Sequence, residues 1–169
     1  MRQLFVISTF ILLTSIKTIL ACDCDSQGAF LTVAPKTEMI SLIKVIRYLT
    51  FKEISDKPTP ISMEVEIVEI FKGQEKRKKI TVWGDNGYLC RPYLNIFEIG
   101  KYYVIAFDRG SVMTDINSTQ AEMKTDYFVS NCGDFWLCVD IDKQIATGAV
   151  TDKQNEIGLK DLKNRLRTK

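Results

Sequence analysis

Histidine is absent from all 169 residues of the chain. Its absence excludes zinc proteases with an H-E-x-x-H motif, hydrolases built on a Ser-His-Asp triad or a Cys-His pair, and most zinc enzymes. A glycine-rich phosphate loop is absent too, and the G-D-N-G segment at 84–87 predicts a hairpin turn instead. We therefore expect no enzymatic activity, no cofactor and no metal ion of the protein's own.

The chain also has little excess charge of either sign. It contains 23 Lys and Arg side chains against 21 Asp and Glu, and Arg2 and Lys17 lie within the first 21 residues. Residues 22–169 are therefore formally neutral, whereas a nucleic-acid-binding domain normally has a basic surplus. We expect the basic runs at 76–79 and 160–169 to be a solvated turn and the solvated face of a helix.

Only the start of the chain has a sustained hydrophobic run. Residues 1–21 have the layout of a secretory signal peptide, with the positive Arg2, an apolar stretch at 4–13 and small Ala21 before the expected cleavage point. The stretch is shorter than the roughly 20 residues that span a bilayer, and no second run follows. We expect residues 22–169 to form one exported domain, either secreted or held in the cell envelope.

All five cysteines lie at or after position 22, and they are Cys22, Cys24, Cys90, Cys132 and Cys138. In an exported chain of this size, clustered cysteines predict disulfides. Cleavage after Ala21 would make a C-x-C pair the N-terminus of the mature protein. Residues 19–22 (I-L-A-C) also form an imperfect bacterial lipobox, so Cys22 is alternatively a site of lipid attachment.

Short apolar or alternating stretches predict strands at 39–51, 62–71, 79–83, 102–107 and 127–129, although 39–51 also fits a helical stripe. Within 62–71 the alternation slips by one residue, so that Val68 and Ile70 take over from Val65 and Ile67. Such a slip predicts a β-bulge.

Polar segments separate these stretches. The D-K-P-T-P sequence at 56–60 predicts a loop, and residues 108–124 predict a long polar loop. That loop carries an N-S-T sequon for glycosylation at Asn117, which matters only in a eukaryotic source. Residues 156–167 predict an amphipathic helix, with Ile157, Leu159, Leu162 and Leu166 along one face. Five short strands and a terminal helix favour a small β-barrel of the OB type, or a sandwich.

Several motifs together resemble a known family. They are the C-x-C at 22–24, V-E-I-F-K-G at 68–73, I-T-V-W at 80–83, F-x-x-G at 97–100 and the later cysteines. They are similar to the netrin-like (NTR) module and, more narrowly, to the tissue inhibitors of metalloproteinases (TIMPs) and their bacterial TIMP-like relatives. The resemblance covers residues 22 to about 132. It implies a five-stranded OB-fold barrel with flanking helices, in one domain over 22–169.

The resemblance also implies a disulfide pattern and a binding mode. The bridges would be Cys22–Cys90 and Cys24–Cys132, which leaves Cys138 unpaired or in an alternative pairing. The α-amine and carbonyl of Cys22 would chelate the catalytic zinc of an extracellular metalloprotease, and Asp23 would enter the protease's specificity pocket. An α-amine with a pKa near 8 has an appreciable neutral fraction that can bind zinc. The family has a small residue where Asp23 stands, and a proline-rich stretch where this chain has residues 25–29.

Two functions follow as hypotheses, and neither is enzymatic. In the first, the protein is a monomeric, disulfide-stabilised binding module that inhibits a zinc metalloprotease through Cys22. In the alternative, a lipid on Cys22 anchors a bacterial envelope domain that has a structural or adaptor role and no inhibitory activity. A lipid would block the amine of Cys22 and leave four cysteines, an even number able to form two bridges.

Overall fold

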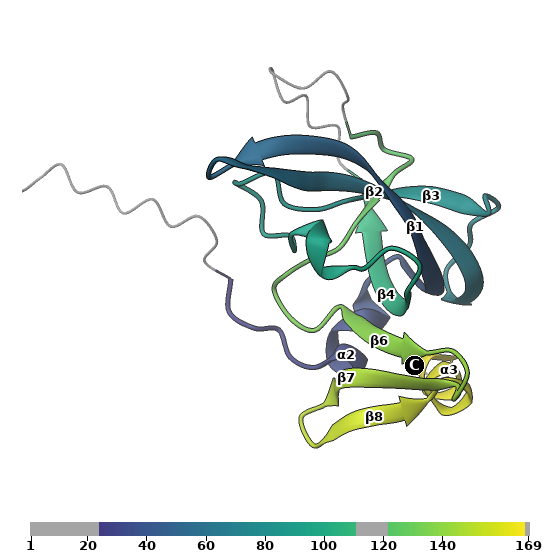
Figure 1. Ribbon diagram of the computed structural model, residues 1–169. Helices are drawn as coiled ribbons and strands as arrows, with labels where there is room; N and C mark the ends of the chain where they lie inside the picture. The colour runs from purple at the N-terminus through teal and green to yellow at the C-terminus, as the bar shows by residue number, and fades with distance from the viewer. Residues whose placement is uncertain (1–23, 111–121, 168–169) are drawn as a thin grey trace, which may run out of the picture.

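The computed structural model describes residues 24–110 and 122–167. The expected signal peptide, Cys22, Asp23 and Asn117 lie outside these ranges. One eight-stranded sheet runs through the described chain, in the order β1-β2-β3-β5-β4-β6-β7-β8 (Figure 1). The strands are β1 (Met39–Ile54), β2 (Lys57–Lys72), β3 (Lys79–Trp83), β4 (Tyr102–Arg109), β5 (Tyr127–Phe128), β6 (Trp136–Asp140), β7 (Ile145–Thr151) and β8 (Gln154–Gly158). The helical segments are α2 (Phe30–Val33), η1 (Ala34–Lys36), η2 (Leu94–Ile96) and α3 (Leu159–Arg167).

Five of the strands form a ring of pairings, because β1 pairs with β4 as well as with β2. Around the ring, β2 pairs with β3, β3 lies parallel to β5, and β5 returns antiparallel to β4. The β-rich fold with a C-terminal helix that the sequence predicts is therefore confirmed.

One hydrophobic core fills this architecture. Residues 103–107 of β4 are all buried, as expected for a central strand that pairs with β1, β5 and β6. Aromatic side chains meet edge to face in the core: the Phe107 and Tyr127 ring centroids lie 5.8 Å apart, and those of Phe97 and Tyr103 lie 5.2 Å apart. Such pairs contribute about 0.5–1.5 kcal/mol beyond their area burial.

Three strands that the sequence analysis did not predict extend the sheet beyond β4. β6, β7 and β8 form an antiparallel meander that lies below the ring in Figure 1, with α3 beside it. The helix contacts β2 and β8, and Leu159, Leu162 and Leu166 are buried. The predicted helix start is wrong: the helix begins at Leu159, and Ile157 is buried as part of β8.

The loop predicted at 56–60 is also wrong. Strand β2 begins at Lys57, and the turn before it consists of Ser55 and Asp56, whose φ angles are 51° and 60°. Pro58 and Pro60 fit within β2 because β3 pairs only with residues 62–66 of that strand. The first part of β2 is thus a sheet edge, where a missing N–H donor breaks no ladder.

The slip predicted within 62–71 is confirmed as a register shift. Leu42 of β1 faces Glu69 and Ile43 faces Ile67, so the pairing skips Val68. The side chain that turns inward after the bulge is Phe71, however, and Val68 is 48% exposed. The bulge therefore changes which side chains of β2 face the core at its end. The alternation pattern suggested Val68 and Ile70, whereas the structure buries Phe71.

The predicted hairpin at 84–87 is wrong, because β3 pairs next with β5 and not with the strand that follows it in sequence. The chain instead enters a long connection that includes η2 and Cys90. The polar loop predicted from 108 begins later, since Asp108 and Arg109 belong to β4.

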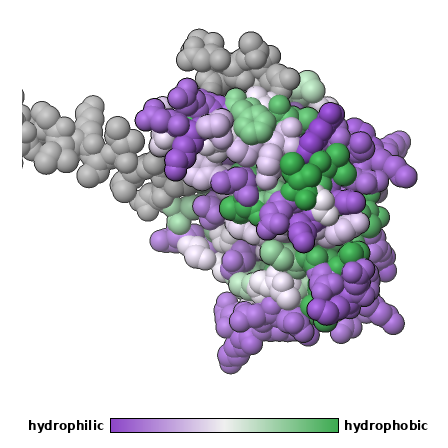
Figure 2. Space-filling model, in the orientation of Figure 1, coloured by the Kyte–Doolittle hydropathy of each residue, from purple (hydrophilic) through white to green (hydrophobic). Residues whose placement is uncertain are grey.

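Within the described ranges, no helix is long and apolar enough to cross a membrane. On the face shown in Figure 2, hydrophobic residues gather mainly toward the middle, and hydrophilic residues surround them.

Candidate functional site

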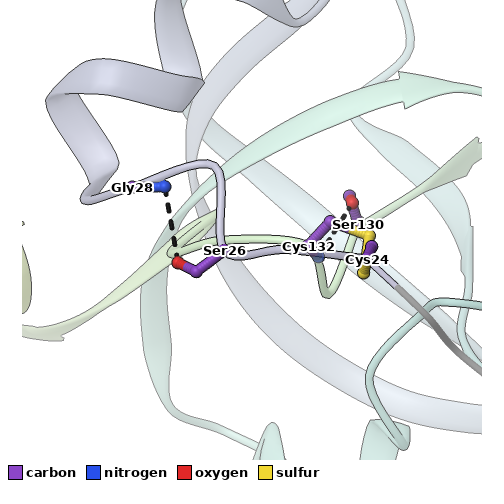
Figure 3. The surroundings of a disulfide bond; sticks show 5 residues. All are labelled: Cys24, Ser26, Gly28, Ser130 and Cys132. Atoms are coloured by element: carbon purple, nitrogen blue, oxygen red, sulfur yellow. Dashed lines mark hydrogen bonds between the residues drawn. A yellow bond between two sulfur atoms is a disulfide. The ribbon is translucent and has the colours of Figure 1, made fainter.

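The N-terminal segment, residues 24–29, lies along residues 130–134 (Figure 3). A disulfide joins Cys24 to Cys132, with 5.5 Å between the Cα atoms. The backbone N–H of Gln27 donates to the carbonyl of Cys132 at 2.7 Å, and that of Asp134 donates to the carbonyl of Gly28 at 3.1 Å. One covalent bond and two backbone hydrogen bonds therefore fix the segment, with the Cys24–Cys132 pairing that the family resemblance implies.

Two glycines permit this close approach. Gly28 has a φ of +110°, a conformation that costs glycine little and strains other residues. At Gly133, an added Cβ would lie 3.1 Å from the carbonyl oxygen of Gly28 and 3.1 Å from Cγ1 of Val33. The segment then enters α2, where Phe30 and Val33 are buried. It is held at one end by the disulfide and at the other by the core.

Serine side chains tighten the same region. The hydroxyl oxygen of Ser130 accepts a hydrogen bond from the N–H of Cys132 at 3.1 Å, and that of Ser26 accepts one from Gly28 at 3.4 Å (Figure 3). In each case a serine hydroxyl bonds to the backbone N–H two residues later and so closes a turn. The two turns order the backbone on each side of the disulfide.

The connection that carries Cys90 lies against this disulfide. The sulfur atoms of Cys24, Cys90 and Cys132 all lie within 4.8 Å of one another, and the N–H of Asn131 donates to the carbonyl of Cys90 at 3.0 Å. Cys90 is itself disulfide-bonded. The three sulfurs are therefore oxidised, and none offers the thiolate that a metal ion requires. The predicted Cys22–Cys90 bridge includes a residue outside the described ranges and stays a prediction.

A buried ion pair fixes the residue next to Cys90. Arg91 donates from both terminal nitrogens to Glu122, at 2.6 and 3.1 Å, and the side chains are only 7% and 4% exposed. The guanidinium carbon of Arg91 also lies 4.2 Å from the ring centroid of Phe128 in β5. This contact ties the Cys90 connection to the ring. No local sequence signal predicts it, because the partners are distant in sequence.

The outer side of the same connection presents tyrosines to solvent. Tyr88 is 78% exposed and Tyr93 is 42% exposed. The backbone before Tyr88 is ordered by Asp85, whose carboxylate accepts hydrogen bonds from the N–H groups of Gly87 and Leu89, each at 2.8 Å. Exposed aromatic side chains on an ordered backbone are well suited to contact another protein. The sequence analysis did not identify these tyrosines.

Cys138 lies apart from this site, on β6 opposite Tyr103 and Thr147. It is a free cysteine. Partial burial of its sulfur and the nearby carboxylate of Glu98 raise the pKa of the thiol. A raised pKa lowers the thiolate fraction and with it the reactivity of this cysteine.

A scan of protein-family models and a search of curated proteins find no match to the chain. The functional interpretation therefore depends on the geometry of the N-terminal segment and its surroundings.

Proposed function

We propose that the chain is an exported, disulfide-stabilised binding module of the NTR/TIMP-like type that inhibits a zinc metalloprotease through Cys22. The observation that carries the proposal is the anchoring of residues 24–28 against 131–134 by one disulfide and two backbone hydrogen bonds. A chain terminus that extends from an ordered anchor loses little conformational entropy when it docks.

The chemistry of the proposed contact belongs to the mature terminus. The neutral α-amine and the carbonyl oxygen of Cys22 would complete the coordination of the protease's zinc in place of its water. Asp23 would enter the adjoining pocket of the protease. Because an ionised carboxylate is costly to bury in apolar surroundings, the proposed target is a protease whose pocket offers a cation or several hydrogen-bond donors.

The described cysteines favour this proposal over lipid attachment. A lipid on Cys22 would leave Cys90 and Cys138 as the remaining pair, yet Cys138 is free and Cys90 is disulfide-bonded. We therefore propose Cys22 as the partner of Cys90, the pairing that the family resemblance implies. A Cys22–Cys90 bridge would tether the terminus beside the exposed Tyr88.

The finer fold assignment is part of the proposal. A five-stranded ring in the order β1-β2-β3-β5-β4 supports an OB-type barrel, since that fold is a five-stranded, partly open barrel with non-sequential strand neighbours. The meander β6–β8 and α3 would then be an extension of the barrel.

Mass spectrometry of the protein from its native host, without reduction, tests the proposed terminus. A free amine on Cys22 and a Cys22–Cys90 peptide link are the expected results. A diacylglycerol adduct on Cys22 would contradict the proposal and favour the lipid-anchored envelope domain. In that case Cys22→Ser would release the protein from membranes.

A further inference from the structure

An open pocket lies at the turn between β2 and β3, where the chain leaves the ring and returns to it. It has a volume of about 780 Å³ and is lined by residues 73–77 together with Ile70, Arg109 and Thr125. Its size falls within the range of small-molecule sites, roughly 300–1,000 Å³. In Figure 1 this turn lies on the right, whereas the N-terminal segment lies on the left. The pocket is therefore separate from the anchored segment at residues 24–29.

A nearly buried carboxylate organises the pocket. The side chain of Glu75 is 8% exposed. One of its oxygens accepts hydrogen bonds from the N–H groups of Lys76 and Arg77, at 2.8 and 2.9 Å. The other accepts from the Arg77 guanidinium at 2.7 Å and from the Tyr127 hydroxyl at 3.0 Å. With four donors in place, Glu75 is fully satisfied by the protein itself and serves as a fixed support.

Two arginines are held in place around this support. Arg77 also donates to the carbonyl oxygen of Thr125 at 2.6 Å. Arg109 donates from Nε to Glu38 at 2.5 Å, and its guanidinium carbon lies 4.4 Å from the ring centroid of Tyr127. A guanidinium that is already stacked and hydrogen-bonded loses little further freedom when it binds a ligand.

Both guanidinium groups keep donors to spare. The contacts of Arg77 engage Nη2, and those of Arg109 engage Nε, with Nη1 lying 3.8 Å from Glu75. Within residues 24–110 and 122–167, Nε and Nη1 of Arg77 and Nη2 of Arg109 have no hydrogen-bond partner. The exposed Lys76 adds a third cation, so the lining carries three positive charges against the one negative charge of Glu75. Glu38, which pairs with Arg109, is not among the lining residues.

We propose that this pocket binds a tetrahedral oxyanion, a phosphate or sulfate group, held by Arg77, Arg109 and Lys76. Arginine forks recognise oxyanions through paired charge-assisted hydrogen bonds. Three cations in one lining suit a group with three or more terminal oxygens better than the two oxygens of a carboxylate. The half-buried Ile70 provides an apolar wall for the remainder of a larger ligand.

Calorimetric titration of the disulfide-bonded protein with inorganic phosphate, sulfate and acetate tests the proposal. Phosphate or sulfate is expected to bind, and to bind more tightly than acetate. Phenyl phosphate distinguishes a free anion from an ester: tighter binding than inorganic phosphate assigns the pocket to esterified ligands, and equal binding assigns it to the free anion. No heat of binding for either tetrahedral anion at millimolar concentration overturns the proposal.

Variants show whether binding occurs in this pocket. Arg109→Lys keeps the charge but removes the fork, and it is expected to weaken binding about tenfold. Lys76→Ala changes an exposed side chain, so it keeps the test valid if Arg109→Lys does not fold. We expect a several-fold loss for Lys76→Ala and no change for Lys153→Ala, a matched loss of charge in the exposed turn between β7 and β8. If Arg109→Lys and Lys76→Ala bind the anion as tightly as the native protein and the Lys153→Ala control do, the anion binds elsewhere and the proposal is overturned.

Discussion

Arg91 and Glu122 lie 31 residues apart in sequence and form a two-pronged ion pair, with N–O distances of 2.6 and 3.1 Å, in which neither side chain is more than 7% exposed. The same Arg91 guanidinium stacks on Phe128 of β5, so the residue that follows Cys90 is held against the ring. Arg91 therefore couples the connection that carries Cys90, beside the proposed binding site, to the five-stranded ring.

Loss of one partner should be costly, because it breaks a buried, two-pronged ion pair and leaves a buried charge without its partner in that pair. We expect Arg91→Met or Glu122→Gln to lower the free energy of unfolding by about 3–5 kcal/mol, measured by urea denaturation. Arg47→Met is the control: Arg47 is 63% exposed and pairs with Glu64 at 3.3 Å, so its loss should cost less than about 1 kcal/mol. Equal effects for the Arg91 and Arg47 variants would show that the buried pair has no special structural role.

Removal of the disulfide should loosen the N-terminal segment. The Cys24–Cys132 bridge spans 108 residues. The double substitution Cys24→Ser/Cys132→Ser is expected to cost about 2–5 kcal/mol in stability. It should also speed amide hydrogen exchange at Gln27 and Asp134, whose N–H groups bond across this contact. The control Cys138→Ser removes a free cysteine and should leave both quantities unchanged; a matching loss there would mean that Cys138 is needed structurally.

Acid should weaken the fold through Glu75. The hydrogen bond from Arg77 and those from the backbone and Tyr127 lower the pKa of Glu75 from 4.5 to about 2. Because the folded state binds this proton more weakly than the unfolded chain, the stabilisation is present above pH 4.5 and is lost as the pH falls toward 2. Glu75→Gln should lower the free energy of unfolding by about 2 kcal/mol at pH 7. The gap in this free energy between the variant and the native protein should narrow as the pH falls toward 2.

Urea denaturation at several pH values measures this effect. Glu53→Gln, at an exposed position near the end of β1, is the matched control and should change the free energy of unfolding at pH 7 by less than about 0.5 kcal/mol. If the free energies of unfolding of Glu75→Gln and the native protein differ by the same amount from pH 7 to pH 2, the lowered pKa of Glu75 is not the cause of that difference.

Close packing at Gly133 provides a fourth test. A methyl group there would press on the carbonyl of Gly28 and on Val33, so Gly133→Ala should destabilise the protein by about 1–3 kcal/mol. At Gly158 the nearest atom to an added Cβ is a side-chain oxygen of Asp161 at 4.0 Å, so Gly158→Ala should be nearly neutral. Thermal unfolding of the two variants makes the comparison. A neutral Gly133→Ala would show that the N-terminal segment adjusts easily.

Elements that depend on neighbouring residues were predicted well from the sequence, and elements that depend on contacts between distant residues were not. Strand β3 was predicted with its observed bounds, because its apolar residues alternate with polar ones up to Val82 and are buried. Strand β4 was predicted except for its last two residues, because its apolar residues are contiguous and mostly buried. Strand β8 was missed because it reads Q-N-E-I-G, with only Ile157 fully buried. The prolines at 58 and 60 suggested a loop, and only the pairing of β3 farther along β2 shows why a strand tolerates them.

For the candidate site, too, the sequence indicated some features and not others. The C-x-C motif drew attention to the N-terminal segment, and the resemblance implied the partner of Cys24. The Arg91–Glu122 pair and the cationic pocket at the β2–β3 turn could not be predicted, since each depends on side chains brought together by non-local strand pairing. The bulge at Val68 was visible as a slip in alternation, but the inward turn of Phe71 depends on the packing around it.

The central claim is that a free Cys22 terminus binds the zinc of a metalloprotease. The most direct measurement compares two forms of the disulfide-bonded protein, one beginning at Cys22 and one with an added Ala before it, in inhibition assays on a panel of zinc metalloproteases. The account predicts that the first form inhibits at least one protease and that the added Ala weakens this inhibition at least a hundredfold. Inhibition of equal strength by both forms, or none by the Cys22 form across the panel, would contradict the claim.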